Sequence, residues 1–365
     1  NIMELQNYIS ENSDYDKTLK ERGFIVKNFN KYDLKLIKYP YDKNVDTNTF
    51  ERYLKGCIVD TKTNKVVMIP PIKSDNLINY NMCVNGAVIQ ELFDGTMINL
   101  FYHNDEWLHS TRSDINLNNK WTKKSFKKMF EECHGGKLDY DKLNKNYTYS
   151  FVMQHTENRN ISVVNVNHII LVEARNRETF DFVDLSEFVN MEYNGYHIVE
   201  NYVVTNLNDY IVQLSNFSST NNGRFNYKGF TVKKDGKRYN YINPEFEMVK
   251  TLKVNSNNPL FNYCSLRKQN KLSVFLYYFY EYNNQFARYN TVVDIFMKEL
   301  YDTYVKVNIK KELDKKDVPF QLKPLVYELH GIYLEHKAKI NLSKVNDYIN
   351  SLEPDRLTFI LKYYL

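Results

Sequence analysis

The chain has 365 residues, of which 43% are hydrophobic, so it is long enough to bury a sizeable core and to form two domains. Its formal net charge is only +5, with 49 basic residues against 44 acidic ones, which permits nucleic acid as a partner without demanding it. No window approaches the roughly 18 uncharged apolar residues of a membrane span. We therefore expect no membrane association and an intracellular, cytoplasmic protein.

The first 80 residues show short helical and strand patterns. Apolar spacing predicts a helix at 3–10 and, after a break at 12–16, a second helical turn that ends at Glu21. Strands are predicted at 24–27 and 34–39, and a hairpin is formed by 57–60 and 66–69. The polar run Thr61 to Asn64 supplies the turn of that hairpin, and Pro70-Pro71 ends it.

The stretch from Val88 to Arg112 is the centre of the prediction. An apolar run leads into Phe93-Asp94-Gly95, alternating residues follow, and Asn104-Asp105 precedes a second strand-like run. This pattern predicts a strand, a tight turn and a hairpin, and we expect a hairpin around Asp94-Gly95 as well.

Later segments change in character near residue 255. A lysine-rich helix is predicted at 121–132, strands at 147–154, 161–166 and 169–174, a partly helical segment at 181–189, and a hairpin at 229–242 with Asp235-Gly236 as its turn. From Leu272 onward apolar residues recur at helical spacing. We predict an α+β fold, with a mixed domain at 1–255 and an all-helical domain at 256–365.

The order of these segments resembles the RNA ligase 1-like family of phages and large DNA viruses, within the covalent nucleotidyltransferases. The five segments that carry the resemblance are Tyr53 to Asn76, Ser110 to Arg112, Phe151 to Arg159, Tyr227 to Val232 and Arg238 to Lys250. The resemblance implies a nucleotidyltransferase domain with antiparallel sheets, followed by an extra helical domain, and a viral origin.

In that family the lysine of a K-x-D-G motif attacks the α-phosphate of ATP, while a metal ion and further lysines neutralise the phosphates. Asp94 and Gly95 match the last two residues of the motif, and Leu92 stands where the lysine belongs. Four further positions are substituted: Val152 for a ribose-contacting Glu, Lys228 for a metal-associated Glu, and Asn240 and Ile242 for two phosphate-binding lysines. Because of these five substitutions, we expect no catalytic residue and no cofactor.

Some positions that would face a nucleotide are retained. Lys55 and Lys73 would face phosphate, Arg112 is a further candidate for nucleotide binding, and Trp107 or Phe93 would stack on a base. Surface lysines and core aromatics are equally good interpretations. The histidines, including His155, do not fall at metal-ligand spacings, so no metal site is predicted. Lys233-Lys234-Asp235-Gly236 also spells K-x-D-G, and we interpret it as an exposed basic turn.

A basic stretch in the helical domain is the candidate for nucleic-acid binding. Its lysines are Lys306, Lys310, Lys311, Lys315 and Lys316. Acidic residues interrupt the run, which also fits a solvated helix face. If the stretch is functional, phosphate contact is its natural use.

Three hypotheses follow. The leading one is a pseudoenzyme with an RNA ligase-like fold that serves as an RNA-binding or scaffolding subunit, with protein partners in a larger assembly, in host cytoplasm or virion. The second is an active ligase that uses ATP and Mg²⁺ with a relocated lysine, for which Lys73 is the candidate. The third is a purely structural protein-interaction subunit.

Overall fold

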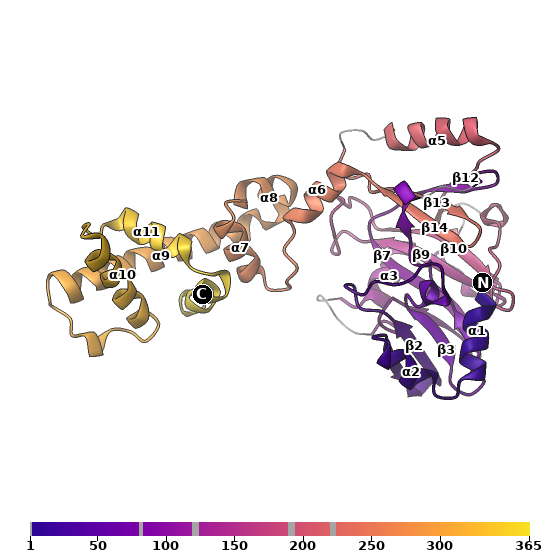
Figure 1. The fold of residues 1–365 in the computed structure, drawn as a ribbon, viewed down its shortest axis with the longest axis horizontal. Coiled ribbons are helices and arrows are strands. Elements are labelled where there is room, and N and C mark those ends of the chain that lie inside the picture. Colours follow the sequence, from indigo (N-terminus) through magenta and orange to yellow (C-terminus); the bar gives the residue numbers. More distant parts are fainter. Residues whose placement is uncertain (1, 80–82, 119–123, 189–193, 220–223) are drawn as a thin grey trace. The chain divides into compact units, whose positions relative to one another are not determined.

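A computed structural model of the chain describes residues 2–79, 83–118, 124–188, 194–219 and 224–365 (Figure 1). It contains two compact units, Asn1–Glu247 and Met248–Leu365. The first unit mixes helices with sheets and the second is helical, so the predicted α+β class with a helical C-terminal region is confirmed. The division falls within helix α6 (Pro244–Leu252), before the predicted position at residue 255.

Three sheets build the first unit (Figure 1). The first sheet has the order β1 (Ile25–Phe29), β2 (Leu34–Lys38), β3 (Cys57–Asp60), β4 (Val66–Met68). The second has the order β11 (His197–Ile198), β10 (His168–Asn176), β9 (Tyr147–Gln154), β7 (Thr96–His103), β8 (Glu106–Ser110). The third has the order β12 (Asn201–Val203), β6 (Val88–Leu92), β13 (Gly229–Lys234), β14 (Lys237–Ile242), β5 (Asp75–Asn76). Two pairs, β10 with β11 and β14 with β5, are parallel, and the other pairs are antiparallel.

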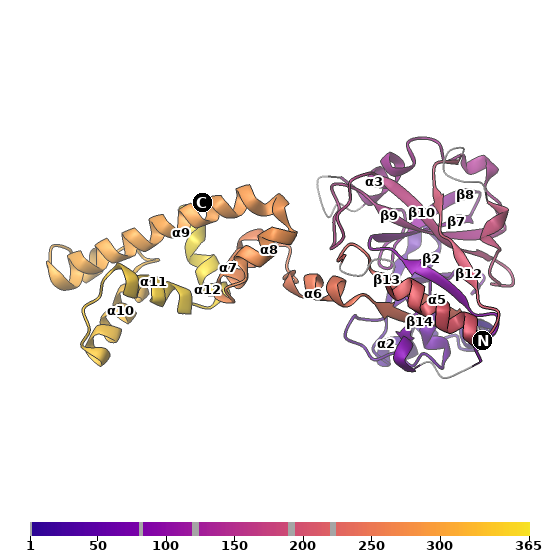
Figure 2. The same cartoon turned by 90° about the horizontal axis from the view of Figure 1, so that it is seen from above.

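Helices cover one face of each sheet. The helices of the first unit, besides α6, are α1 (Ile2–Glu11), α2 (Tyr15–Glu21), α3 (Phe126–His134) and α5 (Leu207–Ser219). Leu5 of α1 and Leu19 of α2 are fully buried in the core of the first sheet, and Phe130 of α3 is fully buried in the core of the second. Both views place α5 along the third sheet, where Tyr210 packs in a cluster with Phe230 of β13 (Figure 2). Short 3₁₀ turns lie at Asn30–Tyr32, Phe50–Tyr53, Leu77–Asn79, Tyr140–Lys142 and Leu185–Glu187.

Most predicted strands and hairpins are confirmed. The pairs β3–β4, β7–β8 and β13–β14 form the expected hairpins. Asn104 and Asp105 have φ of 49° and 64°, and Asp235 and Gly236 have φ of 50° and 71°. Two successive residues with positive φ match the right-handed twist of the flanking strands, which explains why these sequences turn there.

The predicted hairpin around Asp94-Gly95 is wrong. Strand β6 pairs with β12 and β13 in the third sheet, whereas β7 pairs with β8 and β9 in the second. Residues 93–95 therefore carry the chain from one sheet to the other. A Cβ on Gly95 would lie 2.5 Å from the carbonyl oxygen of Met153 and 2.7 Å from Cγ1 of Val152, so only glycine fits where this crossing passes β9.

The predicted strand at 161–166 is also wrong. Side-chain oxygens, and not the carbonyls of a neighbouring strand, accept hydrogen bonds from the backbone amides at the start of this segment. The amides of Ile161 and Ser162 donate to Oδ2 of Asp94 at 2.8 and 2.9 Å, and the amide of Val163 donates to Oδ1 of Asn226 at 2.9 Å. These bonds replace a sheet ladder. The helix predicted at 121–132 corresponds to α3, with Gly135 as its left-handed C-cap; residues 121–123 lie outside the described part of the chain.

The second unit is a helical bundle. Its helices are α7 (Pro259–Lys268), α8 (Leu272–Tyr278), α9 (Asn283–Tyr304), α10 (Lys323–His336), α11 (Leu342–Ser351) and α12 (Pro354–Leu361). Helix α9 buries one face, with Phe286, Tyr289, Val293, Phe296 and Leu300 at helical spacing. It continues into a π-helical turn, Val305–Ile309. Among the described residues, no helix combines the length and apolar character needed to cross a membrane.

Candidate functional site

A cavity of about 430 Å³, the first cavity, is lined by residues of the second and third sheets. Its apolar part includes Leu92 at the end of β6, Phe93 in the crossing and Val152 on β9. Leu92 is 9% exposed and Val152 is 5% exposed. The position of the motif lysine and that of the ribose-contacting Glu therefore both line the first cavity, and neither carries a reactive or charged group.

The structure brings most, but not all, of the candidate residues to this cavity. Besides those two, its lining includes Gly95, Lys55, Arg112, Lys228 and Asn240. Asp94, Ile242, Lys73 and Trp107 are not part of the lining. Trp107 instead packs edge-on against Tyr102, with ring centroids 5.4 Å apart, and at 6.1 Å from Tyr149. Trp107 is therefore not a stacking surface of the first cavity.

Asp94 has a structural role. Its carboxylate is 8% exposed and accepts the two amide hydrogen bonds from the loop that follows β9, and its backbone oxygen accepts from Nε2 of Gln154 at 2.8 Å. The aspartate of the K-x-D-G-like motif thus joins the crossing to that loop, and it does so with leucine at the position of the motif lysine.

Cationic side chains dominate the polar part of the first cavity. Lys55, which precedes β3, Arg112, which follows β8, Lys228, which precedes β13, and Arg238 of β14 all line it. Burial, together with the charges of Arg238, Arg112, Lys228 and Lys73, lowers the pKa of Lys55 to about 7. The positive charges around Lys55 therefore disfavour its own protonation, and an anion in the cavity would relieve that repulsion.

Local backbone geometry fixes two of these cations side by side. Gly56 has a φ of 91°, and a Cβ there would lie 2.9 Å from Cα of Arg112. The guanidinium of Arg112 donates to the backbone oxygen of Tyr39 and lies 4.1 Å from the ring centroid of Tyr41. The Lys-Gly pair therefore allows the chain before β3 to approach the chain after β8.

The residues fit a phosphate group but not a metal ion. Among the described lining residues Glu91 is the one carboxylate, and burial and the nearby Glu200 raise its pKa. A divalent ion of the Mg²⁺ type needs several oxygen ligands, and carboxylates supply most of its charge compensation. Several lysine and arginine side chains around a single carboxyl group with a raised pKa favour an anionic ligand instead.

Arg238 is the functional candidate that sequence reasoning missed. It lies on β14 with Asn240, two residues apart, so both side chains face the same side of the strand. The alternation of side chains along a strand could have identified Arg238 from the sequence, because it places Arg238 on the same side of the strand as Asn240, a predicted phosphate-contacting position. In the segment Lys233-Lys234-Asp235-Gly236, the turn residues Asp235 and Gly236 are exposed as predicted, whereas the side chain of Lys233 is only 14% exposed.

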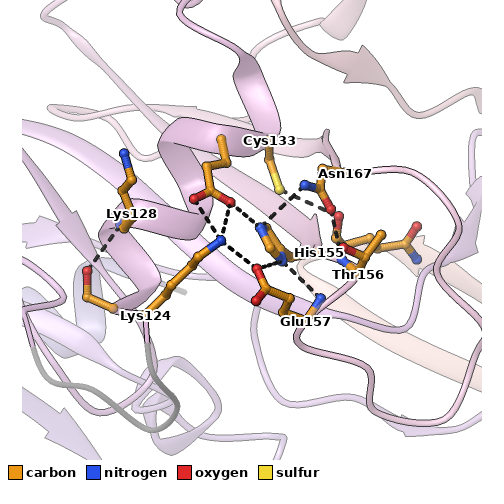
Figure 3. Close-up of polar contacts among 10 residues, drawn as sticks. Lys124, Lys128, Cys133, His155, Thr156, Glu157 and Asn167 are labelled. Atoms are coloured by element: carbon orange, nitrogen blue, oxygen red, sulfur yellow. Dashed lines mark hydrogen bonds and ion pairs between the residues drawn. The ribbon is translucent and has the colours of Figure 1, made fainter. Parts of the chain in front are cut away.

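A separate polar cluster joins α3 to the chain after β9 (Figure 3). Nε2 of His155 lies 2.7 Å from Oε2 of Glu132, and Lys124 Nζ lies 3.1 Å from Glu132 Oε1 and 2.6 Å from Glu157 Oε2. Hydrogen bonds from His155 and Lys124 hold the pKa of Glu132 below its usual value. Three potential metal ligands lie close together here, which sequence spacing did not predict, but the Lys124 ammonium already bridges both carboxylates.

The lysines of the candidate nucleic-acid surface are exposed in the second unit. Lys306 lies in the π-helical turn and pairs with Asp302 at 2.9 Å, while Lys310, Lys311, Lys315 and Lys316 follow it in exposed positions. Phe320, close to them in the sequence, is 71% exposed. The stretch is thus accessible to a macromolecular partner.

No model of a known protein family matches the chain. It is 23% identical, over 338 residues, to a protein of Invertebrate iridescent virus 3 named "Immediate-early protein ICP-46 homolog", covering 85% of this chain and 73% of that protein. The fold has likeness to solved ATP-dependent ligases. An archaeal ATP-dependent RNA ligase aligns with a TM-score of 0.48 and 11% identity, covering 72% of this chain and 68% of that one. A putative ATP-dependent DNA ligase from Aquifex aeolicus aligns with a TM-score of 0.44 and 12% identity, covering 80% and 79%.

Proposed function

We propose that this chain is a nucleotidyltransferase-like pseudoenzyme that binds a phosphorylated ligand without forming a covalent bond to it, and that it acts as an RNA-binding or scaffolding subunit. The observation that carries the proposal is the composition of the first cavity. Leu92 and Val152 supply no nucleophile and no metal ligand, while Lys55, Arg112, Lys228 and Arg238 supply positive charge. Binding of an anion is retained in this arrangement, whereas lysyl-nucleotide formation at the motif position is lost.

The order of the motif-like segments supports the nucleotidyltransferase part of this proposal. The segments that carry Leu92, Val152, Lys228 and Asn240 are far apart in the chain, and all four side chains line one cavity. The similarity to an iridescent virus protein supports a viral origin. We expect the chain to act in the host cytoplasm or the virion, with protein partners.

Incubation with radiolabelled ATP and Mg²⁺ or Mn²⁺, followed by denaturing electrophoresis, tests the loss of covalent chemistry. No label is expected to remain with the chain, whereas titration calorimetry is expected to detect ATP binding that persists when the metal is removed by EDTA. Lys228→Ala should weaken that binding roughly tenfold, because it removes one charge-assisted contact to phosphate. An acid-labile adenylate on the denatured chain would contradict the proposal.

One observation favours a second candidate function, an active nucleotidyltransferase with a relocated lysine. Lys55 lines the first cavity with a pKa lowered to about 7, so a large share of its amine is neutral and nucleophilic near neutral pH. Lys73, the candidate from the sequence, is outside the lining. This alternative requires an adenylate in the wild-type chain that Lys55→Ala abolishes and Lys73→Ala retains.

RNA binding and a purely structural role are separated by a second measurement. Retention of single-stranded RNA at physiological salt, abolished when Lys310 and Lys311 are reversed to Glu, supports RNA binding. Absence of RNA retention in the wild-type chain favours the protein-interaction role.

A further inference from the structure

A second cavity, of about 370 Å³, lies in the first unit beside the first one. The two cavities share Ile72, Val172 and Arg238 in their linings. The second cavity is bordered by the β13–β14 hairpin, by β10 and by the chain that follows β10. None of the segments that resemble nucleotidyltransferase motifs requires a ligand there, and its residues play no part in the function proposed above except for Arg238.

Buried charge is unbalanced in this second cavity. Oε1 of Glu173 lies 3.0 Å from Nζ of Lys233 and 4.0 Å from Nη1 of Arg238, and its Oε2 lies 3.4 Å from Nε of Arg175. Glu173 is 4% exposed, and among the described residues no other carboxylate is within 4.0 Å of those three cations. One carboxylate cannot neutralise three cations, and uncompensated charge is costly where water is scarce.

The protonation equilibria agree with this excess. Although burial opposes it, the surrounding cations lower the pKa of Glu173 to about 2, so its carboxylate stays ionised. Burial lowers the pKa of Lys233 to about 8, in spite of the nearby Glu173. The cluster as a whole therefore gains from an additional anion.

Part of the lining of the second cavity is apolar and aromatic. Val88, Val183 and Leu185 contribute aliphatic surface. Phe182 is 52% exposed, and Cζ of Arg175 lies 4.2 Å from its ring centroid while Nζ of Lys233 lies 5.2 Å from it. A backbone bridge between Arg175 and Phe182 holds the ring beside the guanidinium. An exposed ring flanked by cations is a surface on which a flat aromatic group can stack.

Two more lysines lie at the turn of the hairpin. Lys234 donates to the backbone oxygen of Asn85 at 2.6 Å and Lys237 donates to Oδ1 of Asn48. Both acceptors are neutral, so these ammonium groups keep their net charge, which the single carboxylate of Asp235 beside Lys234 offsets only in part. The second cavity thus combines the buried cations around Glu173 with two further lysines at the hairpin turn and with apolar side chains.

We propose that the second cavity is a binding site for a phosphorylated aromatic ligand of the size of a nucleoside monophosphate. The aromatic ring stacks on Phe182 beside the aliphatic side chains, and the phosphate binds between Lys233 and Arg238, which are directly opposite each other in the β13–β14 ladder. The proposal does not depend on binding in the first cavity, because Phe182, Lys233 and Lys237 line the second cavity and not the first.

Titration calorimetry with three probes tests this assignment: uridine monophosphate, which carries both features, uridine, which has only the ring, and pyrophosphate, which has only the charge. Uridine monophosphate should bind more tightly than either of the other two. Phe182→Ala should weaken its binding roughly tenfold, the usual effect of removing one base-stacking ring. Phe320→Ala, which removes an exposed ring in the other unit, is the matched control and should leave the affinity unchanged.

Removal of the competing carboxylate gives a test in the opposite direction. Glu173→Gln has the same shape and should raise the affinity for uridine monophosphate, provided that circular dichroism shows a folded chain. Photocrosslinking of 5-bromouridine monophosphate to the wild-type chain, read by peptide mass spectrometry, should label residues 173–185 or 233–238 and needs no variant. No binding of any probe would overturn the proposal. Loss of binding in Lys55→Ala but not in Phe182→Ala would also overturn it, and would leave the first-cavity function intact.

Discussion

Nζ of Lys233 lies 3.0 Å from Oε1 of Glu173, and this pair ties the β13–β14 hairpin of the third sheet to β10 of the second. A buried ion pair contributes little against apolar residues of the same shape, but breaking it leaves an unpaired charge behind. Here the unpaired charges would be cationic, because Arg175 and Arg238 share the same carboxylate. Glu173 therefore links the second sheet to the third in the wall of the second cavity.

The first prediction concerns Glu173 and acid stability. Its pKa is lowered from 4.5 to about 2 in the folded chain, so its contribution to the free energy of unfolding is present above pH 4.5 and is lost as the pH falls towards 2. Glu173→Gln should reduce the free energy of unfolding at pH 7 by roughly 3 kcal/mol. It should also flatten the loss of stability between pH 4.5 and 2. Urea unfolding at a series of pH values measures both, with the exposed Glu178→Gln as control.

The second prediction concerns the motif position. Leu92→Lys alone should not restore adenylation, because Val152, Lys228 and Asn240 remain in the same cavity and the new ammonium adds to an existing cationic cluster. Labelled ATP with metal, followed by denaturing electrophoresis, checks this. Recovery of a covalent adenylate from this single change would show that the other substitutions do not matter for the chemistry.

The third prediction concerns the amine of Lys55. Because its pKa is lowered to about 7, the neutral amine should react with acetic anhydride at near-neutral pH far faster than Lys62, whose side chain is 72% exposed. The rate should rise through a midpoint near pH 7, as read by mass spectrometry of the labelled peptides. Pyrophosphate in the first cavity should protect Lys55 and shift that midpoint upward, because an anion favours the charged amine. Equal rates at Lys55 and Lys62 would contradict this account.

The sequence was enough to place most strands, because alternation and turn residues are local signals. The β7–β8 and β13–β14 turns, Asn104-Asp105 and Asp235-Gly236, are examples. It could not show that β6 and β7 belong to different sheets, since the choice depends on Gly95 passing close to Val152 and Met153, which come more than 50 residues later.

The cavities were only partly predictable for the same reason. Motif order identified Leu92, Val152 and Lys228, which line the first cavity. Glu173 belongs to no motif, and its importance arises from cations supplied by a different sheet. Trp107 was a candidate for base stacking because of its aromatic ring alone. In the structure its ring packs against Tyr102 and Tyr149 instead.

The fourth prediction concerns Asp94. Asp94→Ala removes the acceptor for the amides of Ile161 and Ser162, which are buried, and should lower the free energy of unfolding by roughly 2–3 kcal/mol. Asp94→Asn keeps one acceptor oxygen and should cost less. Thermal and urea unfolding measure the difference. Equal stability of the Ala variant and the wild-type chain would show that the retained aspartate does not hold the loop.

The last prediction concerns the exposed lysines after α9. If Lys310 and Lys311 bind RNA phosphates, reversal of both to Glu should weaken the binding of single-stranded RNA. It should also reduce the slope of log affinity against log salt by roughly 0.7 for each phosphate that is no longer neutralised. Lys344→Glu, an exposed charge reversal on α11 of the same unit, is the control for net charge. Filter binding at several salt concentrations gives the slopes. If the control lowers affinity as much as the double reversal, the effect belongs to overall charge and not to this surface.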